Sequence, residues 1–85
     1  MIVHDAAQIG RLVRARRKDV GLTVAEAAEL AAVSRRLLTE LERGKRRNVG
    51  VAALLRVLEV LGMRVEVEPR SLPPPRQPDR ERRGA

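Results

Sequence analysis

The chain has 85 residues and a formal net charge of +7, because 18 Lys and Arg residues outnumber 11 Asp and Glu residues. It has no Cys, which excludes disulfides and thiolate metal sites, and no Phe, Tyr or Trp, which argues against readers of single-stranded nucleic acid that stack bases on aromatic rings. No apolar run is long enough for a membrane span or a secretory signal, so we expect a cytoplasmic protein, and the basic excess favours a polyanion such as nucleic acid as its partner.

The composition also limits the core. A chain of this length forms one small core, built here from Leu, Val, Ile and Ala, which bury less area per residue than aromatic side chains. We therefore expect dimerisation to supply part of the stability.

The first predicted helix begins after Asp5 and ends at Gly21. Asp5 is a good N-cap residue, and Gln8 three positions later completes a capping box. Gly21 suits the left-handed conformation in which helices commonly end. The apolar stripe of this helix consists of Ile9, Leu12, Val13 and Val20.

A second, short helix is predicted from about Val24 to Ala31. Thr23 and Glu26 have the spacing of a capping box at its start. Ala27, Ala28 and Ala31 fall on one face, so another helix can approach closely. Residues 32–34 form a tight turn into the next helix, which makes a helix-turn-helix unit.

The third predicted helix spans residues 34–44. Ser34 can cap its start, and Gly44 can end it in a left-handed turn. Leu38 and Leu41 share one face, which packs on the domain. The side chains lying away from that face are Arg35, Arg36, Thr39 and Arg43.

A basic loop at residues 45–48 leads to a fourth predicted helix, about residues 51–61. Gly50 or Asn48 caps its start, and Gly62 ends it. Its apolar stripe consists of Leu54, Val57, Leu58 and Leu61.

After this helix the pattern changes to a period of two. The apolar residues at 63, 65 and 67 alternate with charged residues, which predicts one half-buried strand. No other segment has a strand pattern, so we expect the strand to pair with its copy in a second subunit. The predicted dimer interface consists of Leu61, Met63, Val65 and Val67. All five prolines lie in residues 69–85, a predicted flexible Pro/Arg-rich tail that follows a domain of residues 1–68.

The segment from about Ile9 to Leu61 resembles the phage-repressor (Cro/XRE-like) helix-turn-helix family. The residues that carry the resemblance are Gly21-Leu22-Thr23, Ala27-Ala28, Val33-Ser34, Leu38 and Leu41-Glu42-Arg43-Gly44, with no gap in their spacing. The resemblance implies a mostly α fold, a four-helix lambda-repressor-like helix-turn-helix domain with the C-terminal β-strand pairing across a homodimer. It also implies a structural pair between Arg17 of the first helix and Glu42 of the recognition helix.

The C-terminal end, residues 61–68, is similar to HipB-type antitoxins, which pair a short strand across the dimer in place of a fifth helix. This resemblance implies an antitoxin that represses its own operon and neutralises a HipA-like serine/threonine kinase toxin. Two positions depart from the family pattern. Val24 replaces a Gln that often contacts a phosphate, and Ala32 replaces a turn Gly, which raises the cost of a positive φ there.

By position in the family, the residues facing the DNA major groove are Ser34, Arg35, Arg36 and Glu40, with Thr39 nearby. Arg35 and Arg36 can each donate two hydrogen bonds to guanine, and the alternative is a solvated helix face. Glu40 either accepts a hydrogen bond from cytosine or pairs with Arg36, and we favour the pair. The residues expected to contact phosphates, or else to form a solubilising loop, are Lys45, Arg46 and Arg47.

Nothing in the sequence indicates an enzyme, because it has one His, no Gly-rich phosphate loop and no cluster with metal-ligand spacing. We therefore expect no catalytic residue, metal or cofactor. The expected function is sequence-specific repression by a homodimer on a palindromic double-stranded operator, most plausibly as the HipB-like antitoxin. The alternatives are a stand-alone XRE-type regulator and a protein-interaction adaptor that does not bind DNA.

Overall fold

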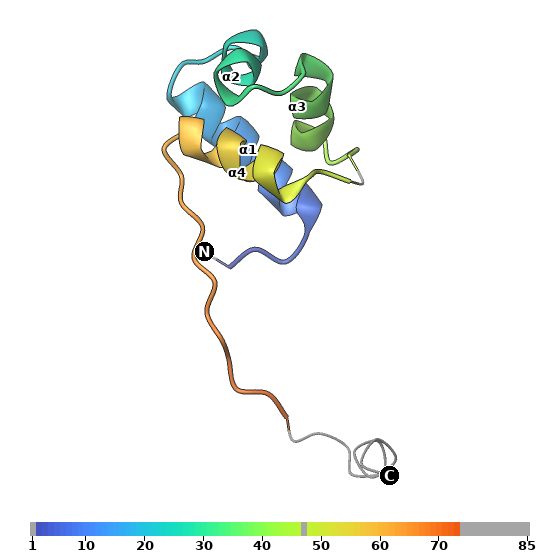
Figure 1. The fold of residues 1–85 in the computed structure, drawn as a ribbon, viewed down its shortest axis with the longest axis vertical. Helices are drawn as coiled ribbons and strands as arrows, with labels where there is room; N and C mark the ends of the chain where they lie inside the picture. Colours follow the sequence, from blue (N-terminus) through green and yellow to red (C-terminus); the bar gives the residue numbers. More distant parts are fainter. Residues whose placement is uncertain (1, 47, 74–85) are drawn as a thin grey trace.

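Four α-helices form the domain in the computed structural model, which describes residues 2–46 and 48–73 (Figure 1). They are α1 (Ala6–Asp19), α2 (Val24–Ala31), α3 (Arg35–Glu42) and α4 (Val51–Val60). Helix α1 packs on α3, and α2 packs on both α3 and α4. Within the described residues no helix combines the length and the apolar character needed to cross a membrane.

Short polar side chains start the first three helices, as the sequence predicts. The Asp5 carboxylate accepts a hydrogen bond from the backbone N of Gln8 at 2.7 Å, and Ser34 Oγ accepts one from the backbone N of Leu37 at 3.0 Å. Thr23 and Glu26 form the complete capping box. The capping box predicted at Asp5 is wrong in one hydrogen bond. The prediction has the Gln8 side chain accepting from the backbone N of Asp5, but Gln8 Oε1 accepts from the backbone N of His4.

The turn between α2 and α3 contains a non-glycine residue in the left-handed region. Ala32 has φ 56° and ψ 43° and is the C-cap of α2. This conformation costs an L-residue about 1–2 kcal/mol. Arg56 of α4 contacts the same turn, donating from Nε to the carbonyl oxygen of Ala31 at 2.9 Å. The structure therefore forms the predicted helix-turn-helix. Its turn is strained at Ala32 and is held by the hydrogen bond from Arg56 of α4.

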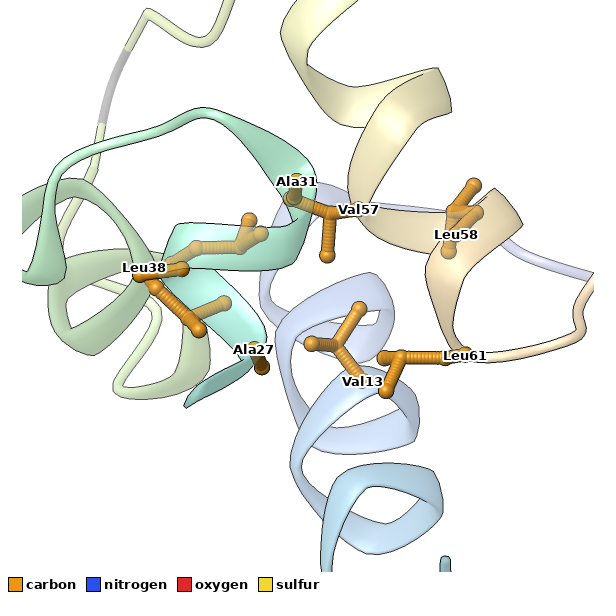
Figure 2. Packing of buried hydrophobic residues seen from close by; sticks show 9 residues of the cluster. Val13, Ala27, Ala31, Leu38, Val57, Leu58 and Leu61 are labelled. Atoms are coloured by element: carbon orange, nitrogen blue, oxygen red, sulfur yellow. The ribbon is translucent and has the colours of Figure 1, made fainter. Parts of the chain in front are cut away.

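The hydrophobic core lies where the four helices meet (Figure 2). Its buried members are Val13, Ala27, Ala28, Ala31, Leu38, Leu41, Val57, Leu58 and Leu61. The prediction for Val20 is wrong, because this residue follows the last turn of α1 and its surface is 42% exposed. The prediction that Leu61 lies at a dimer interface is also wrong, since it is 1% exposed and packs in the core of its own domain.

A close approach of α1 to the end of α3 depends on Gly10. A Cβ atom added at this position would lie 1.9 Å from the backbone oxygen of Leu41, far inside van der Waals contact. Gly10 is therefore required by packing, although glycine lowers intrinsic helix stability.

The segment after α4 leaves the helices as an extended chain (Figure 1). Met63 packs against the core, whereas Val65 is 54% and Val67 90% exposed. Within residues 2–46 and 48–73 there is no β-strand. A strand at 63–68 requires hydrogen bonds from a second chain, so pairing across a dimer stays a prediction. Of the predicted tail, residues 74–85 lie outside the described residues.

Candidate nucleic-acid interface

Helix α3 buries one side and exposes the other. Leu38 and Leu41 are buried and attach the helix to the domain. Ser34, Arg35 and Arg36 are exposed at its N-terminal end, and the side chain of Arg36 is 84% exposed. A short helix that packs on the domain through one side and carries exposed Arg side chains on its first turn has the shape that enters a DNA major groove.

The Glu40 carboxylate forms ion pairs with two arginine side chains. Its carboxylate accepts from Arg46 Nη1 at 2.8 Å and from Arg36 Nε at 3.2 Å. These hydrogen bonds, that of Arg46 first, hold the pKa of Glu40 below its ordinary value. The favoured pair with Arg36 is confirmed, and the pair with Arg46 was missed because it depends on how the loop folds back onto α3.

The loop after α3 is only partly free to contact a ligand. Arg46 donates from Nε to the backbone oxygen of Asn48 at 3.1 Å in addition to its pair with Glu40, so it holds the loop on α3. Lys45 is exposed, and Thr39 is half-buried beside it. Arg47 lies outside the described residues. Phosphate contacts by this loop stay a prediction.

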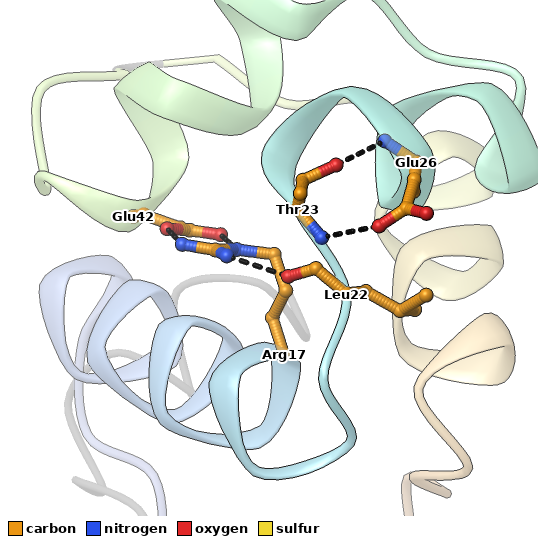
Figure 3. Close-up of polar contacts among 5 residues, drawn as sticks. All are labelled: Arg17, Leu22, Thr23, Glu26 and Glu42. Atoms are coloured by element: carbon orange, nitrogen blue, oxygen red, sulfur yellow. Dashed lines mark hydrogen bonds and ion pairs between the residues drawn. The ribbon is translucent and has the colours of Figure 1, made fainter.

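A buried ion pair fixes the end of α3 to α1. Arg17 donates from Nε and Nη2 to the two carboxylate oxygens of Glu42 at 2.6 and 2.9 Å, and its Nη1 donates to the backbone oxygen of Leu22 at 2.8 Å (Figure 3). The hydrogen bond with Glu42 raises the pKa of Arg17 further above its already high value. The predicted pair is confirmed in geometry. It ties α1, the loop before α2 and α3 together at one point.

A hollow between α1, α2 and α3 lies next to this pair. Its lining residues are Arg14, Arg17, Val24, Thr39, Glu42, Arg43 and Lys45. Arg14 has no predicted binding role, although its spacing of three residues from Arg11 places both on one face of a helix. In the described part of the chain, no group of three or more His, Cys, Asp or Glu side chains is arranged to hold a metal ion.

Comparisons with known proteins agree with this geometry. The family model described as "Helix-turn-helix domain" matches residues 8–70. The N-terminal DNA-binding domain of SinR from Bacillus subtilis is similar with a TM-score of 0.64 and 31% identity, over 68% of this chain and 84% of that chain. The structure of SinR, the master regulator for biofilm formation, in complex with DNA gives a TM-score of 0.62 and 32% identity, over 66% of this chain and 89% of that one.

The restriction-modification controller protein C.AhdI from Aeromonas hydrophila is similar with a TM-score of 0.65 and 28% identity, over 71% of this chain and 89% of that chain. No curated protein matches the sequence. The family match covers most of the chain, and the solved structures share its arrangement of helices. The chain therefore belongs to the helix-turn-helix domain family, of the Cro/XRE type.

Proposed function

We propose that this protein is a sequence-specific transcriptional regulator that binds double-stranded DNA. The observation that carries the proposal is the pair of exposed arginines, Arg35 and Arg36, on the first turn of a helix that is anchored by Leu38, Leu41 and Glu42. The similarity to SinR, whose structure is known in complex with DNA, supports it. The proposed activity is binding without catalysis, and the proposed location is the cytoplasm.

The proposal divides specificity and affinity between two groups of residues. Arg35 and Arg36 read bases, because a guanidinium can donate two hydrogen bonds to guanine. Lys45 and the neighbouring loop arginines contact phosphates, which position the protein without reading sequence. When Arg36 binds a base, its ion pair with Glu40 is weakened, and the ion pair with Arg46 still neutralises the Glu40 carboxylate.

The test starts by selecting bound duplexes from a random-sequence DNA library and measuring their affinities by fluorescence anisotropy. Arg36→Ala is expected to cost about 1–3 kcal/mol and to relax the preference at one base pair. Lys45→Ala is expected to weaken all duplexes alike and to reduce the salt dependence by about one phosphate contact. Arg70→Ala, which removes an exposed charge outside α3 and outside residues 63–68, is the control. Failure to enrich any sequence refutes the proposal, and uniform effects of both variants refute the division of roles.

We further propose that the active form is a homodimer that pairs residues 63–68 across a two-fold axis. Val65 and Val67 are exposed in the single chain, and the backbone around them has no strand partner within the described residues. Val65→Asp is expected to dissociate the dimer and thereby to weaken binding to a palindromic duplex. Arg64→Asp places the same side chain on the opposite face and is the matched control. A Val65→Asp protein that sediments as a dimer would refute this interface.

The finer assignment is that of a HipB-like antitoxin that represses its own operon and neutralises a HipA-like kinase. Its support is the sequence pattern of residues 61–68, and a stand-alone XRE-type regulator is the alternative. The discriminating experiment adds the product of a neighbouring kinase-like gene to the DNA titration. A changed affinity supports the antitoxin, and an unchanged affinity supports the stand-alone regulator. A protein that prefers no DNA sequence is better explained as an adaptor.

A further inference from the structure

Among the described residues, some basic side chains of this domain form ion pairs with carboxylates and others do not. The ion pairs found among residues 2–46 and 48–73 engage Arg16, Arg17, Arg36, Arg46 and Arg64. The basic residues of α1 and the end of α3 that pair with no carboxylate within this described part are Arg11, Arg14, Lys18, Arg43 and Lys45. The second group therefore offers charge to an external ligand.

These unpaired side chains line two adjoining hollows. The first, between α1, α2 and α3, contains Arg14 together with Arg43 and Lys45. The second, along α1, is lined by Arg11, Arg14, Ala15, Lys18 and Glu42. Arg14 and Glu42 belong to both, so the cationic surface continues from the recognition helix onto α1. Glu42 does not offset this charge, because its carboxylate is already bound by Arg17.

The spacing along α1 matches an extended ligand. Arg11, Arg14 and Lys18 stand at positions i, i+3 and i+7, which places them on one face of the helix. They span about 10 Å of the α1 axis, at about 1.5 Å per residue. The same length of duplex contains about three base pairs at about 3.4 Å each.

We infer that this face of α1 is a second phosphate-binding surface, which holds the DNA backbone flanking the major groove entered by α3. The inference rests on the proposed function and adds residues to it: Arg14 first, then Arg11 and Lys18. Arg14 lies in the same hollow as Thr39 and Lys45, which the proposed function places at the DNA. Two α1 residues line that hollow, Arg14 and Arg17. Arg17 already donates to Glu42 and to the backbone oxygen of Leu22, so Arg14 is the α1 residue that offers its donors to a ligand.

Phosphate chemistry and the position of the surface favour DNA over an acidic protein as the occupant. The second hollow offers only Ala15 as apolar surface among its basic side chains. The guanidinium of Arg matches the geometry of a phosphate, with two parallel hydrogen bonds. The surface also continues directly into the helix proposed to read bases.

The test compares the full chain with Arg14→Gln and with the double variant Arg11→Gln, Lys18→Gln, on the selected duplex and on a scrambled duplex of equal length. Affinity is measured by anisotropy from 50 to 200 mM salt. Each lost phosphate contact is expected to lower the slope of log K against log salt by about 0.9. The loss of affinity is expected to be the same for both duplexes, with the sequence preference unchanged. Arg70→Gln, an exposed position outside both α1 and residues 63–68, is the matched control, and circular dichroism melts verify folding of these exposed-site variants.

The outcomes separate this inference from the function on which it rests. A wild-type protein that prefers no duplex refutes the proposed function. A wild-type protein that prefers the selected duplex, while the α1 variants keep the salt dependence of Arg70→Gln, overturns only the α1 surface. An Arg14→Gln protein that loses sequence preference also overturns the inference, because Arg14 then acts on the recognition helix instead of a phosphate.

Discussion

Gly10→Ala is expected to destabilise the domain, although alanine is the better helix former. In an isolated helix this substitution gains about 1 kcal/mol. Here the new Cβ atom would lie 1.9 Å from the backbone oxygen of Leu41 and 3.4 Å from Cα of Glu42. Because Cβ atoms essentially never approach other heavy atoms closer than 3.0 Å, α1 and the end of α3 must separate by about 1 Å.

That separation also strains the pair between Arg17 and Glu42, since Glu42 directly follows Leu41 and its hydrogen bonds to Arg17 are 2.6 and 2.9 Å long. Overpacking costs about 1–3 kcal/mol, and a weakened buried pair adds to it, so we expect a net loss of about 2 kcal/mol. For a domain of this size the melting temperature then falls by about 10 °C. The assay is urea and thermal unfolding followed by circular dichroism.

Ala15→Gly, at an exposed position of the same helix, is the control and measures helix propensity alone. It is expected to lower stability by about 1 kcal/mol. A Gly10→Ala protein that melts above the wild type would refute the reasoning, because it would mean that α1 and α3 do not approach as closely as described.

Three further predictions concern other contacts. Either Arg17→Met or Glu42→Gln alone is expected to cost about 3–5 kcal/mol, because each leaves a buried charge unpaired, and a double-mutant cycle in urea should give a large coupling energy. Ala32→Gly is expected to raise stability by up to about 1 kcal/mol by relieving the positive φ, and a lower melting temperature would contradict that. Hydrogen bonds from Thr23 lower the pKa of Glu26 below its ordinary value of 4.5. The ionised Glu26 carboxylate therefore contributes its full stabilisation of the folded state above pH 4.5, and this stabilisation is lost as the pH falls through the lowered pKa. Glu26→Gln keeps an acceptor at this cap without a titrating group, so the ratio of its stability at pH 3 to that at pH 7 should exceed that of the wild type.

The helices could be predicted from the sequence because their start and stop signals are local. Thr23 with Glu26 and Ser34 cap their helices through bonds to residues three positions away, which the sequence spacing contains. The pair between Arg17 and Glu42 joins residues 25 positions apart, and only the family resemblance identified it.

Contacts set by tertiary packing could not be predicted in the same way. The role of Gly10 depends on how α1 crosses α3, and its only sequence signal is a glycine inside a helical pattern. Leu61 fits both the apolar stripe of the fourth predicted helix and the predicted dimer interface, and its position as the C-cap of α4 places it in the core. Arg14 belongs to the candidate site through the hollow that α1 shares with α3, which no linear pattern contains.

The two sides of α3 have consequences for how this protein can change its target. The residues that fasten the helix are Leu38, Leu41 and Glu42, and none of them is among the exposed side chains of its first turn. Exposed surface positions tolerate substitution with little effect on stability. Arg35 and Arg36 can therefore be exchanged for other side chains while the helix stays in place. If these side chains read bases as we propose, new operators become accessible by a few substitutions on one turn, and the scaffold needs no compensating change.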